Sequence, residues 1–422
     1  MVAIYCLQSI ILNWGRRKSC AGVSGPIWNH IFAEENSMAQ REELSGEALA
    51  ALIERVFRPR ASDRAVAFLV DMPDRVRGDS PAWRERREMT AQWVRRLAPL
   101  QAKLGLEVRL YLYRNVRTNN ADLPRGAWLH GGGPLPGSAD DLDPLAEVAF
   151  SDIFRTHSIL MAVTELSPTA PLKLTAGTYG FRAATMPGFS PAMIPALRLD
   201  YEEINRRVAK LKELLDRAEG ADFQFAVDGG QECTLHLDLR HRSGHASGGL
   251  LPEPGTAGNL PSGEAYIVPY EGEIAGTPSA SAGQLPVQFG DEVVVYDIAG
   301  NCAVRVSGSG AAARAEAGRL AGEPAYGNIA ELGLGVLADF GVKPCGSILL
   351  DERLGLHIAF GRSDHFGGSV GPSRFSRPEA VVHIDRVYLP SMQPRVHVRR
   401  AALSGPDWEL LLIHEDRFVI DY

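Results

Sequence analysis

The chain contains 422 residues, of which 45% are hydrophobic and 23% are charged, close to the average for globular proteins. This length predicts two domains rather than a single core. A formal net charge of −7 argues against a nucleic-acid-binding protein, which needs a concentrated basic face.

The first 37 residues differ from the rest of the chain. The apolar residues 4–12 precede the basic residues 16–18, which reverses the charge order of a secretory signal. We therefore expect residues 1–37 to be an N-terminal extension outside the fold, with Met38 as the working start. No apolar run is long enough to span a bilayer. The five cysteines form no Cys-x-x-Cys pair, which favours a cytoplasmic protein without a thiolate zinc site.

Residues 38–220 alternate between helical and strand patterns. The pattern predicts an α/β domain with helices over 42–56, 80–104 and 201–218 and strands over 65–71, 107–113 and 158–164. The apolar run 65–71 is typical of a strand buried on both faces. Asp200 is a suitable N-cap for the third helix. Arginines between residues 84 and 96 alternate with glutamates, which predicts a solvated helix face.

Residues 221–422 are dominated by short strands between glycines and prolines. We expect a strand-rich, α+β catalytic domain with two helices, over 310–320 and 328–339. The predicted strands are 234–238, 292–296, 302–306, 347–350, 357–360, 381–384 and 395–398, followed by a closing hairpin over 408–414 and 417–420.

Five residues of this half have the side chains that bind divalent metals. His383 and Asp385 lie two apart at the end of the predicted strand 381–384, and residues two apart on a strand project to one face. His357 begins another strand, and Glu264 enters a third after the stiff segment Pro-Ser-Gly. Glu331 lies in an apolar, glycine-containing segment, where a buried carboxylate is costly without a cation. Imidazoles and carboxylates from separate segments are the usual ligands of such ions, so we expect a metal site here.

Other polar groups of this half leave alternatives open. The glycine-rich loop 361–368 contains Asp364 and His365, and it is either an ordinary loop or part of the site. Polar and apolar residues alternate over 236–240, which is typical of a solvated strand face or of the wall of a cleft. A substrate-contacting role for Arg240 and His245 stays possible. The serines near these histidines lack a Gly-x-Ser-x-Gly elbow, which argues against a serine nucleophile.

The ordered motifs of residues 220–390 resemble the aminopeptidase T family of metallopeptidases. These motifs are Pro-Ser-Gly-Glu264, Ala-Glu331-Leu-Gly-Leu-Gly, Asp351-Glu352-Arg353 with His357-Ile-Ala-Phe-Gly, and His383-x-Asp385. The resemblance implies an N-terminal α/β domain and a catalytic domain that holds two divalent ions (zinc, cobalt or manganese). The implied ligands are Glu264, Glu331, His357, His383 and Asp385. The implied reaction is removal of the N-terminal residue from short peptides, and the family habit suggests a homodimer.

One position departs from the family pattern. The family has a tyrosine seven residues after its first histidine, where this chain has Asp364 followed by His365. A tyrosine can donate a hydrogen bond to a developing oxyanion, and an ionised aspartate cannot. Either Asp364 is an additional ligand or His365 supplies the donor.

A second resemblance gives an alternative reaction. Pyridine-diol ring-cleaving dioxygenases look like distant relatives of the same catalytic half and use one iron(II). Such a site needs two histidines and one carboxylate, which His357, His383 and Asp385 could supply. A mononuclear iron site does not require Glu264 and Glu331, so we favour the dinuclear hydrolase. A third alternative is a non-catalytic relative that keeps the ligands for stability.

Overall fold

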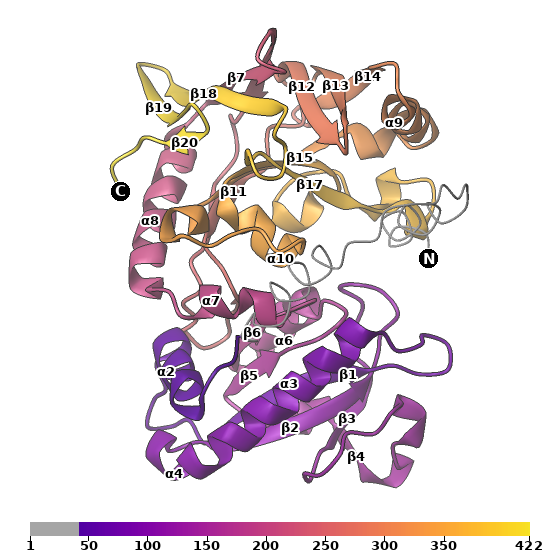
Figure 1. Cartoon of the computed structure of the whole chain (residues 1–422), viewed down its shortest axis with the longest axis vertical. Coiled ribbons are helices and arrows are strands. Elements are labelled where there is room, and N and C mark those ends of the chain that lie inside the picture. The colour runs from indigo at the N-terminus through magenta and orange to yellow at the C-terminus, as the bar shows by residue number, and fades with distance from the viewer. Residues whose placement is uncertain (1–41) are drawn as a thin grey trace, which may run out of the picture. The chain divides into compact units, whose positions relative to one another are not determined.

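The computed structural model describes residues 42–422, so the predicted extension over residues 1–37 lies outside the described residues. Three sheets form the framework of the described chain (Figure 1). The first is a seven-stranded sheet in the order β10-β6-β5-β1-β2-β3-β4. Its strands are β1 (Ala65–Met72), β2 (Glu107–Arg114), β3 (Gly126–Leu129), β4 (Glu147–Ala149), β5 (Ile159–Ala162), β6 (Arg182–Thr185) and β10 (Ala257–Asn259).

The strands from β10 to β2 are parallel, and helices cover this sheet. All eight residues of β1 are buried because alternate side chains enter two different clusters. Phe68 belongs to one hydrophobic cluster and Leu69 to the other. Figure 1 shows α3 lying along β1 and β2. The helices of this half are α2 (Gly46–Phe57), α3 (Pro81–Leu97), α4 (Gln101–Leu104), α5 (Phe150–Thr156), α6 (Thr169–Tyr179), α7 (Ile194–Leu197) and α8 (Tyr201–Arg217).

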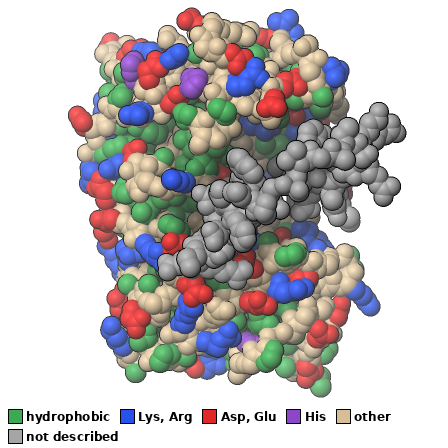
Figure 2. Space-filling view, viewed as in Figure 1, with side chains coloured by type: hydrophobic (Ala, Val, Ile, Leu, Met, Phe, Trp, Pro, Cys, Tyr) green, Lys and Arg blue, Asp and Glu red, His purple; other side chains and the backbone are tan. Residues whose placement is uncertain are grey.

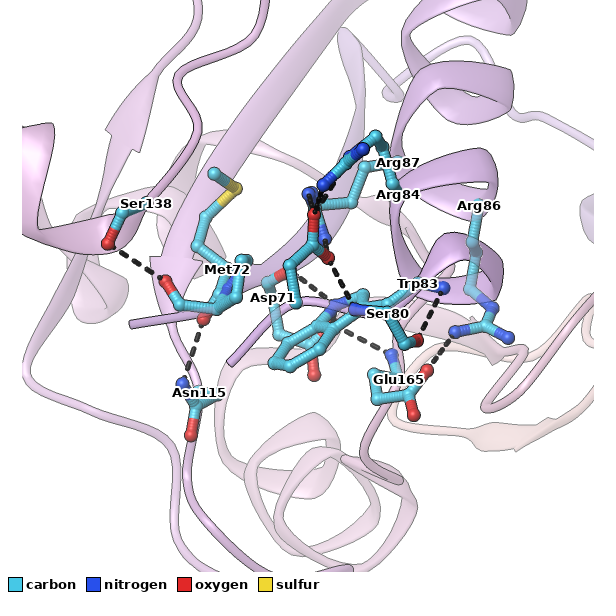
Figure 3. A network of polar contacts seen from close by, with 12 residues as sticks. Asp71, Met72, Ser80, Trp83, Arg84, Arg86, Arg87, Asn115, Ser138 and Glu165 are labelled. Atoms are coloured by element: carbon cyan, nitrogen blue, oxygen red, sulfur yellow. Dashed lines mark hydrogen bonds and ion pairs between the residues drawn. The ribbon is translucent and has the colours of Figure 1, made fainter. Parts of the chain in front are cut away.

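Two arginines of α3 correct the prediction of a solvated face, whereas Arg84 and Arg95 are exposed as predicted. Arg86 and Arg87 are only 5% and 3% exposed. Arg87 forms an ion pair with Asp79 at 3.0 Å, and Arg86 pairs with Glu165 (Figure 3). The partner acids come from loops rather than from the helix, so the helix sequence alone could not reveal them. Buried guanidinium groups are tolerated here because each has an acidic partner.

Asp71 connects three segments of the same half. It is fully buried at the end of β1 and accepts hydrogen bonds from Trp83 Nε1 and from the backbone N–H groups of Glu165 and Leu166 (Figure 3). Burial raises the pKa of Asp71 to about 6, against the opposing effect of these donors. Asp71 therefore fixes the loop after β5 against α3, just before α6 begins.

The second sheet has eight strands in the order β14-β13-β12-β8-β7-β18-β19-β20, and its pairs are antiparallel. They are β7 (Gly220–Val227), β8 (Gln231–Asp238), β12 (Ala282–Phe289), β13 (Glu292–Ala299), β14 (Cys302–Ser307), β18 (Val396–Gly405), β19 (Trp408–His414) and β20 (Arg417–Phe418). The third sheet has five antiparallel strands in the order β17-β16-β15-β11-β9. They are β9 (His245–Ser247), β11 (Glu264–Ile267), β15 (Ile329–Gly335), β16 (Leu356–Gly361) and β17 (His383–Val387).

One core joins the three sheets. Phe68 of β1, Ile204 of α8, Leu235 of β8 and Ile267 of β11 belong to the same buried cluster. β7 begins at Gly220, where the second domain was predicted to begin, whereas β10 comes from the second half and pairs with β6 of the first. Residues 43–422 accordingly form one compact unit.

Two predicted elements are wrong. The predicted helix over 328–339 is β15 followed by a short 3₁₀ helix (Leu337–Phe340), and the predicted strand over 347–350 is the short helix α10 (Ile348–Asp351). All seven residues of β15 are buried, so the strand lacks the alternation that would identify it. The predicted helix over 310–320 is confirmed as α9 (Ala311–Gly322).

The surface shows charges of both signs. On the face drawn in Figure 2, Lys and Arg side chains are interspersed with Asp and Glu side chains. Such mixing is typical of a solvated protein surface. Within residues 42–422, no helix has both the length and the apolar character needed to cross a membrane.

Candidate metal centre

Four neighbouring strands of the third sheet bring the five predicted ligands together. The register aligns Glu331 of β15 with Ala359 of β16, and Ala359 with Asp385 of β17. His357 of β16 is aligned with Gly333 of β15. Residues aligned across strands, or two apart along a strand, share one face of a sheet. The ligand-type side chains therefore project from the same face.

Glu331 lies between the two imidazoles. Its Oε1 atom is 3.3 Å from His357 Nε2, and its Oε2 atom is 3.2 Å from His383 Nε2. Glu264 Oε2 lies 3.7 Å from His357 Nε2, and Asp385 Oδ1 lies 3.4 Å from His383 Nε2. The five residues form two overlapping groups, in each of which one ligand atom per residue lies within 4.8 Å of the others. Glu331 belongs to both groups, as a ligand bridging two ions would.

Backbone carbonyls orient both imidazoles. His357 Nδ1 lies 3.3 Å from the carbonyl oxygen of Gly355, and His383 Nδ1 lies 2.8 Å from that of Arg362. Donation from Nδ1–H leaves Nε2 directed at the carboxylates, the arrangement usual for histidines that bind a metal.

Glu264 is held by an arginine on one side only. Arg353 Nη2 lies 3.0 Å from Glu264 Oε1, and Arg353 also pairs with Glu352 and donates to the Leu349 carbonyl. Glu264 Oε2 is buried and has no hydrogen-bond partner among the described residues. A buried carboxylate oxygen without a donor is costly, and a cation beside it would remove that cost. The donor set of three carboxylates and two imidazoles fits divalent zinc, cobalt or manganese.

Gly333 makes room for the His357 ring. A Cβ atom at Gly333 would lie 1.9 Å from His357 Nε2, a distance that no real contact allows. The imidazole therefore lies directly over the backbone of β15. Sterics within the site therefore explain why the Gly-x-Gly segment after Glu331 begins with a glycine.

When no ion is bound, the neighbouring carboxylates have the largest net effect on the pKa values of both imidazoles. Burial alone would lower the pKa of His357, but Glu331, Glu264 and Asp385 raise that pKa to about 10. The pKa of His383 is also raised well above its ordinary value, because Asp385 and Glu331 outweigh burial. Burial raises the pKa of Glu352 to about 8, although the charge of Arg353 opposes this.

These pKa shifts predict how pH affects the metal-free protein. The His357 pKa is about 10 in the fold and 6.5 in its ordinary state, so its stabilising contribution is complete below pH 6.5. That contribution is lost as pH rises through about 10. Metal binding needs neutral Nε2 atoms, so metal affinity should rise over the same range. We expect chelator-treated protein to have a lower melting temperature at pH 9.5 than at pH 6.5. A melting temperature that rises with pH would contradict these protonation states.

A cavity of about 540 Å³ adjoins the centre. Glu264, Glu331 and His383 line it, as do His365 and Tyr266. The cavity also receives residues of the α/β half, including Lys173 of α6. This volume lies within the range of pockets for small molecules.

His365 lines this cavity and Asp364 does not. Asp364 accepts a hydrogen bond from Arg362 Nε at 2.5 Å, and it is not among the residues that line the cavity. The His365 ring lines the cavity, with its centroid 5.3 Å from that of His383. Burial, reinforced by the charge of His383, lowers the pKa of His365 to about 4, so its imidazole is neutral at pH 7.

The two residues left open as substrate contacts have partners in the fold. Arg240 forms an ion pair with Asp238 at 2.7 Å. The His245 ring stacks on Tyr266 at 5.0 Å between centroids, and its Nε2 lies 2.9 Å from the Phe366 carbonyl oxygen.

Sequence reasoning missed three residues near the centre. Tyr266 lies two residues after Glu264 on β11, so the period-two rule could have placed it on the same face. Arg353 belongs to the motif Asp351-Glu352-Arg353, but nothing in the sequence indicates that it forms an ion pair with Glu264. Lys173 belongs to the α/β half, and no sequence pattern connects it with the centre.

Comparison with known proteins shows the fold. No protein-family model matches the chain, and no curated protein matches it. Among solved structures, 2,5-dihydroxypyridine dioxygenase from Pseudomonas putida KT2440 superposes with a TM-score of 0.56 at 15% identity, over 90% of this chain and 99% of that one. Wild-type AmpT, an aminopeptidase T from Thermus thermophilus, superposes with a TM-score of 0.50 at 15% identity, over 89% and 98%. The chain therefore has a mixed α/β fold similar to those of both enzymes.

Proposed function

We propose that the chain is a metal-dependent hydrolase of the aminopeptidase type, which removes the N-terminal residue from short peptides with two divalent ions. The observation that carries this proposal is Glu331, whose two oxygens lie near two different imidazoles. Two overlapping ligand groups suit a pair of ions better than a single ion. We keep zinc, cobalt and manganese as the candidate metals.

The residues of such a site have different roles. When bound, a pair of ions lowers the pKa of a shared water and polarises the scissile carbonyl. Glu264, Glu331 and Asp385 supply the negative charge that holds cations, and Arg353 fixes the position of Glu264. His365 is neutral and lines the cavity, so it can donate a hydrogen bond to a developing oxyanion or accept a proton. Asp364 is turned to Arg362, so the geometry favours His365 over Asp364 for this role.

Replacing the His365 imidazole tests that role. We expect His365→Gln to lower kcat about 10²-fold, the scale for losing one general base or oxyanion donor. Metal content should not change, because His365 belongs to neither ligand group. Elemental analysis and steady-state kinetics on amino-acid amides measure both effects. His414→Gln, at an exposed position of β19, is the matched control. A loss of metal in His365→Gln would show that this residue is a ligand instead.

The second candidate is an iron(II)-dependent ring-cleaving dioxygenase. It is favoured by the similarity of fold to the dihydroxypyridine dioxygenase. His357, His383 and Asp385 would be its ligands, but these three do not form either ligand group found among the described residues. Each group instead contains Glu331, which this alternative leaves without a role.

Metal analysis of the purified protein separates the candidates. About two zinc, cobalt or manganese ions per chain, with release of N-terminal residues from short peptides, is the result we expect. A single iron per chain with cleavage of a pyridine-diol ring would overturn the hydrolase. Normal metal content without turnover of either substrate class would indicate a non-catalytic relative. The cytoplasmic location, the homodimer and the small substrate stay predictions.

A further inference from the structure

The α/β half contributes its own wall to the cavity beside the metal centre. Asn120, Ser167, Thr169 and Lys173 line this wall. Ser167, Thr169 and Lys173 come from α6 and the segment just before it, which Asp71 fixes through the loop after β5. Hydrogen bonds to the buried Asp71 therefore connect the wall to the end of β1.

Most polar groups of this wall are already paired with one another. Asn120 Oδ1 accepts hydrogen bonds from Ala170 N at 3.0 Å and from Ser167 Oγ at 3.1 Å. Thr169 Oγ1 donates to Asn259 Oδ1 at 3.0 Å. The bond to Asn120 occupies the N–H group of Ala170 in the first turn of α6, and Thr169 N donates to Ser167 Oγ at 3.3 Å.

Lys173 is the exception on this wall. Lys173 is an exposed residue that lines the cavity, and it makes no hydrogen bond or ion pair with any described residue. Arg353 also lines the cavity, but its guanidinium group is paired with Glu264 and Glu352. Burial among the surrounding atoms lowers the pKa of Lys173, while the charge of Glu264 raises it. An ammonium group that is partly desolvated and unpaired gains from an anionic partner.

We propose that Lys173 binds the carboxylate of a small substrate whose reacting group lies at the metal centre. This inference rests on the proposed function and specifies its substrate class. A short peptide has a free amine at one end and a carboxylate at the other, and the cavity is lined both by the carboxylates of Glu264 and Glu331 and by the ammonium group of Lys173. A volume of about 540 Å³ suits a peptide of very few residues rather than a protein chain. Lys173 therefore selects short peptides with a free C-terminus.

The dipeptide Leu-Gly and its C-terminal amide test this inference, because they differ only in the carboxylate. The full, metal-loaded chain is assayed with both probes as the native protein and as Lys173→Met. We expect Lys173→Met to raise KM for Leu-Gly about tenfold, the effect of losing one charge-assisted contact, and to leave KM for the amide unchanged. Lys173→Arg should recover part of the difference. Lys103→Met, at an exposed position of α4, is the control for charge alone.

The outcomes separate the anion site from the proposed reaction. If the native protein hydrolyses neither probe, calorimetric binding constants for both replace KM. A Lys173-dependent preference for Leu-Gly in binding without hydrolysis would support the carboxylate site and refute the aminopeptidase. Hydrolysis in which Lys173→Met affects both probes equally, or neither, would refute the carboxylate site and leave the aminopeptidase standing. Failure to bind or hydrolyse either probe would refute both.

Discussion

Glu331→Gln should remove most of the bound metal and nearly all activity. The amide keeps the shape of the side chain but has one oxygen instead of two and no charge. Only one of the two imidazoles, His357 or His383, can then face an oxygen at this position. The ligand group that receives the NH₂ would lose its shared member and the other group would lose a negative charge, so metal content should fall from about two to below one per chain. We expect kcat/KM to fall on the order of 10⁴-fold, the scale for losing a principal catalytic group.

Elemental analysis of dialysed protein and kinetics on short peptides measure these effects. Glu409→Gln is the matched control, because Glu409 is an exposed residue of β19 whose ion pair is with Arg400. Unchanged metal content in Glu331→Gln, with activity near that of the native protein, would contradict the bridging role. An unfolded variant would be recognised by its circular dichroism spectrum.

The three helices and three strands that were predicted in the α/β half correspond to observed elements because their signals are local, whereas α5, α6 and β6 were not predicted. The run 65–71 is apolar throughout since β1 has both faces covered, and Asp200 caps α8 by accepting from two backbone N–H groups. β15 was mistaken for a helix for a related reason: its complete burial leaves no alternation to read. Ion pairs such as Arg86–Glu165 join residues 79 positions apart, and no local pattern contains them.

The ligand-type residues could be named from the sequence because their chemistry and order are distinctive. The i, i+2 spacing of His383 and Asp385 correctly placed both on one strand face. The positions of the five ligand-type residues relative to one another depend on the order and register of the strands in the third sheet. The position of Glu331 between two imidazoles, the support of Glu264 by Arg353 and the position of Lys173 in the same cavity are all non-local. They required the structure.

Small residues lie between the ligand-type side chains of this sheet. Gly333 and Ala359 lie on the ligand face between larger side chains, and they leave room for the imidazole and the carboxylates. Of the two, Gly333 has the stricter requirement, because its position is covered by the His357 ring. A backbone hydrogen bond at Nδ1 holds that ring, and the ring is only 1% exposed, so it has little space in which to move.

Gly333→Ala should therefore displace His357 and weaken the metal site without changing a ligand. The added methyl group would lie 1.9 Å from His357 Nε2, so the ring must leave its position or β15 must shift. We expect a loss of about 1–3 kcal/mol in the free energy of unfolding, the usual cost of overpacking. Metal content should fall, because His357 leaves the group that it forms with Glu264 and Glu331.

Gly318→Ala provides the control for Gly333→Ala. Gly318 lies within α9 and has no atom within 4 Å of its would-be Cβ, so this change should stabilise the protein slightly, by up to about 1 kcal/mol. Chemical denaturation and elemental analysis of both variants give the comparison. Native metal content and stability in Gly333→Ala would mean that the His357 ring does not lie over β15. The two-ion arrangement would then lose its geometric basis, because His357 would no longer face Glu331.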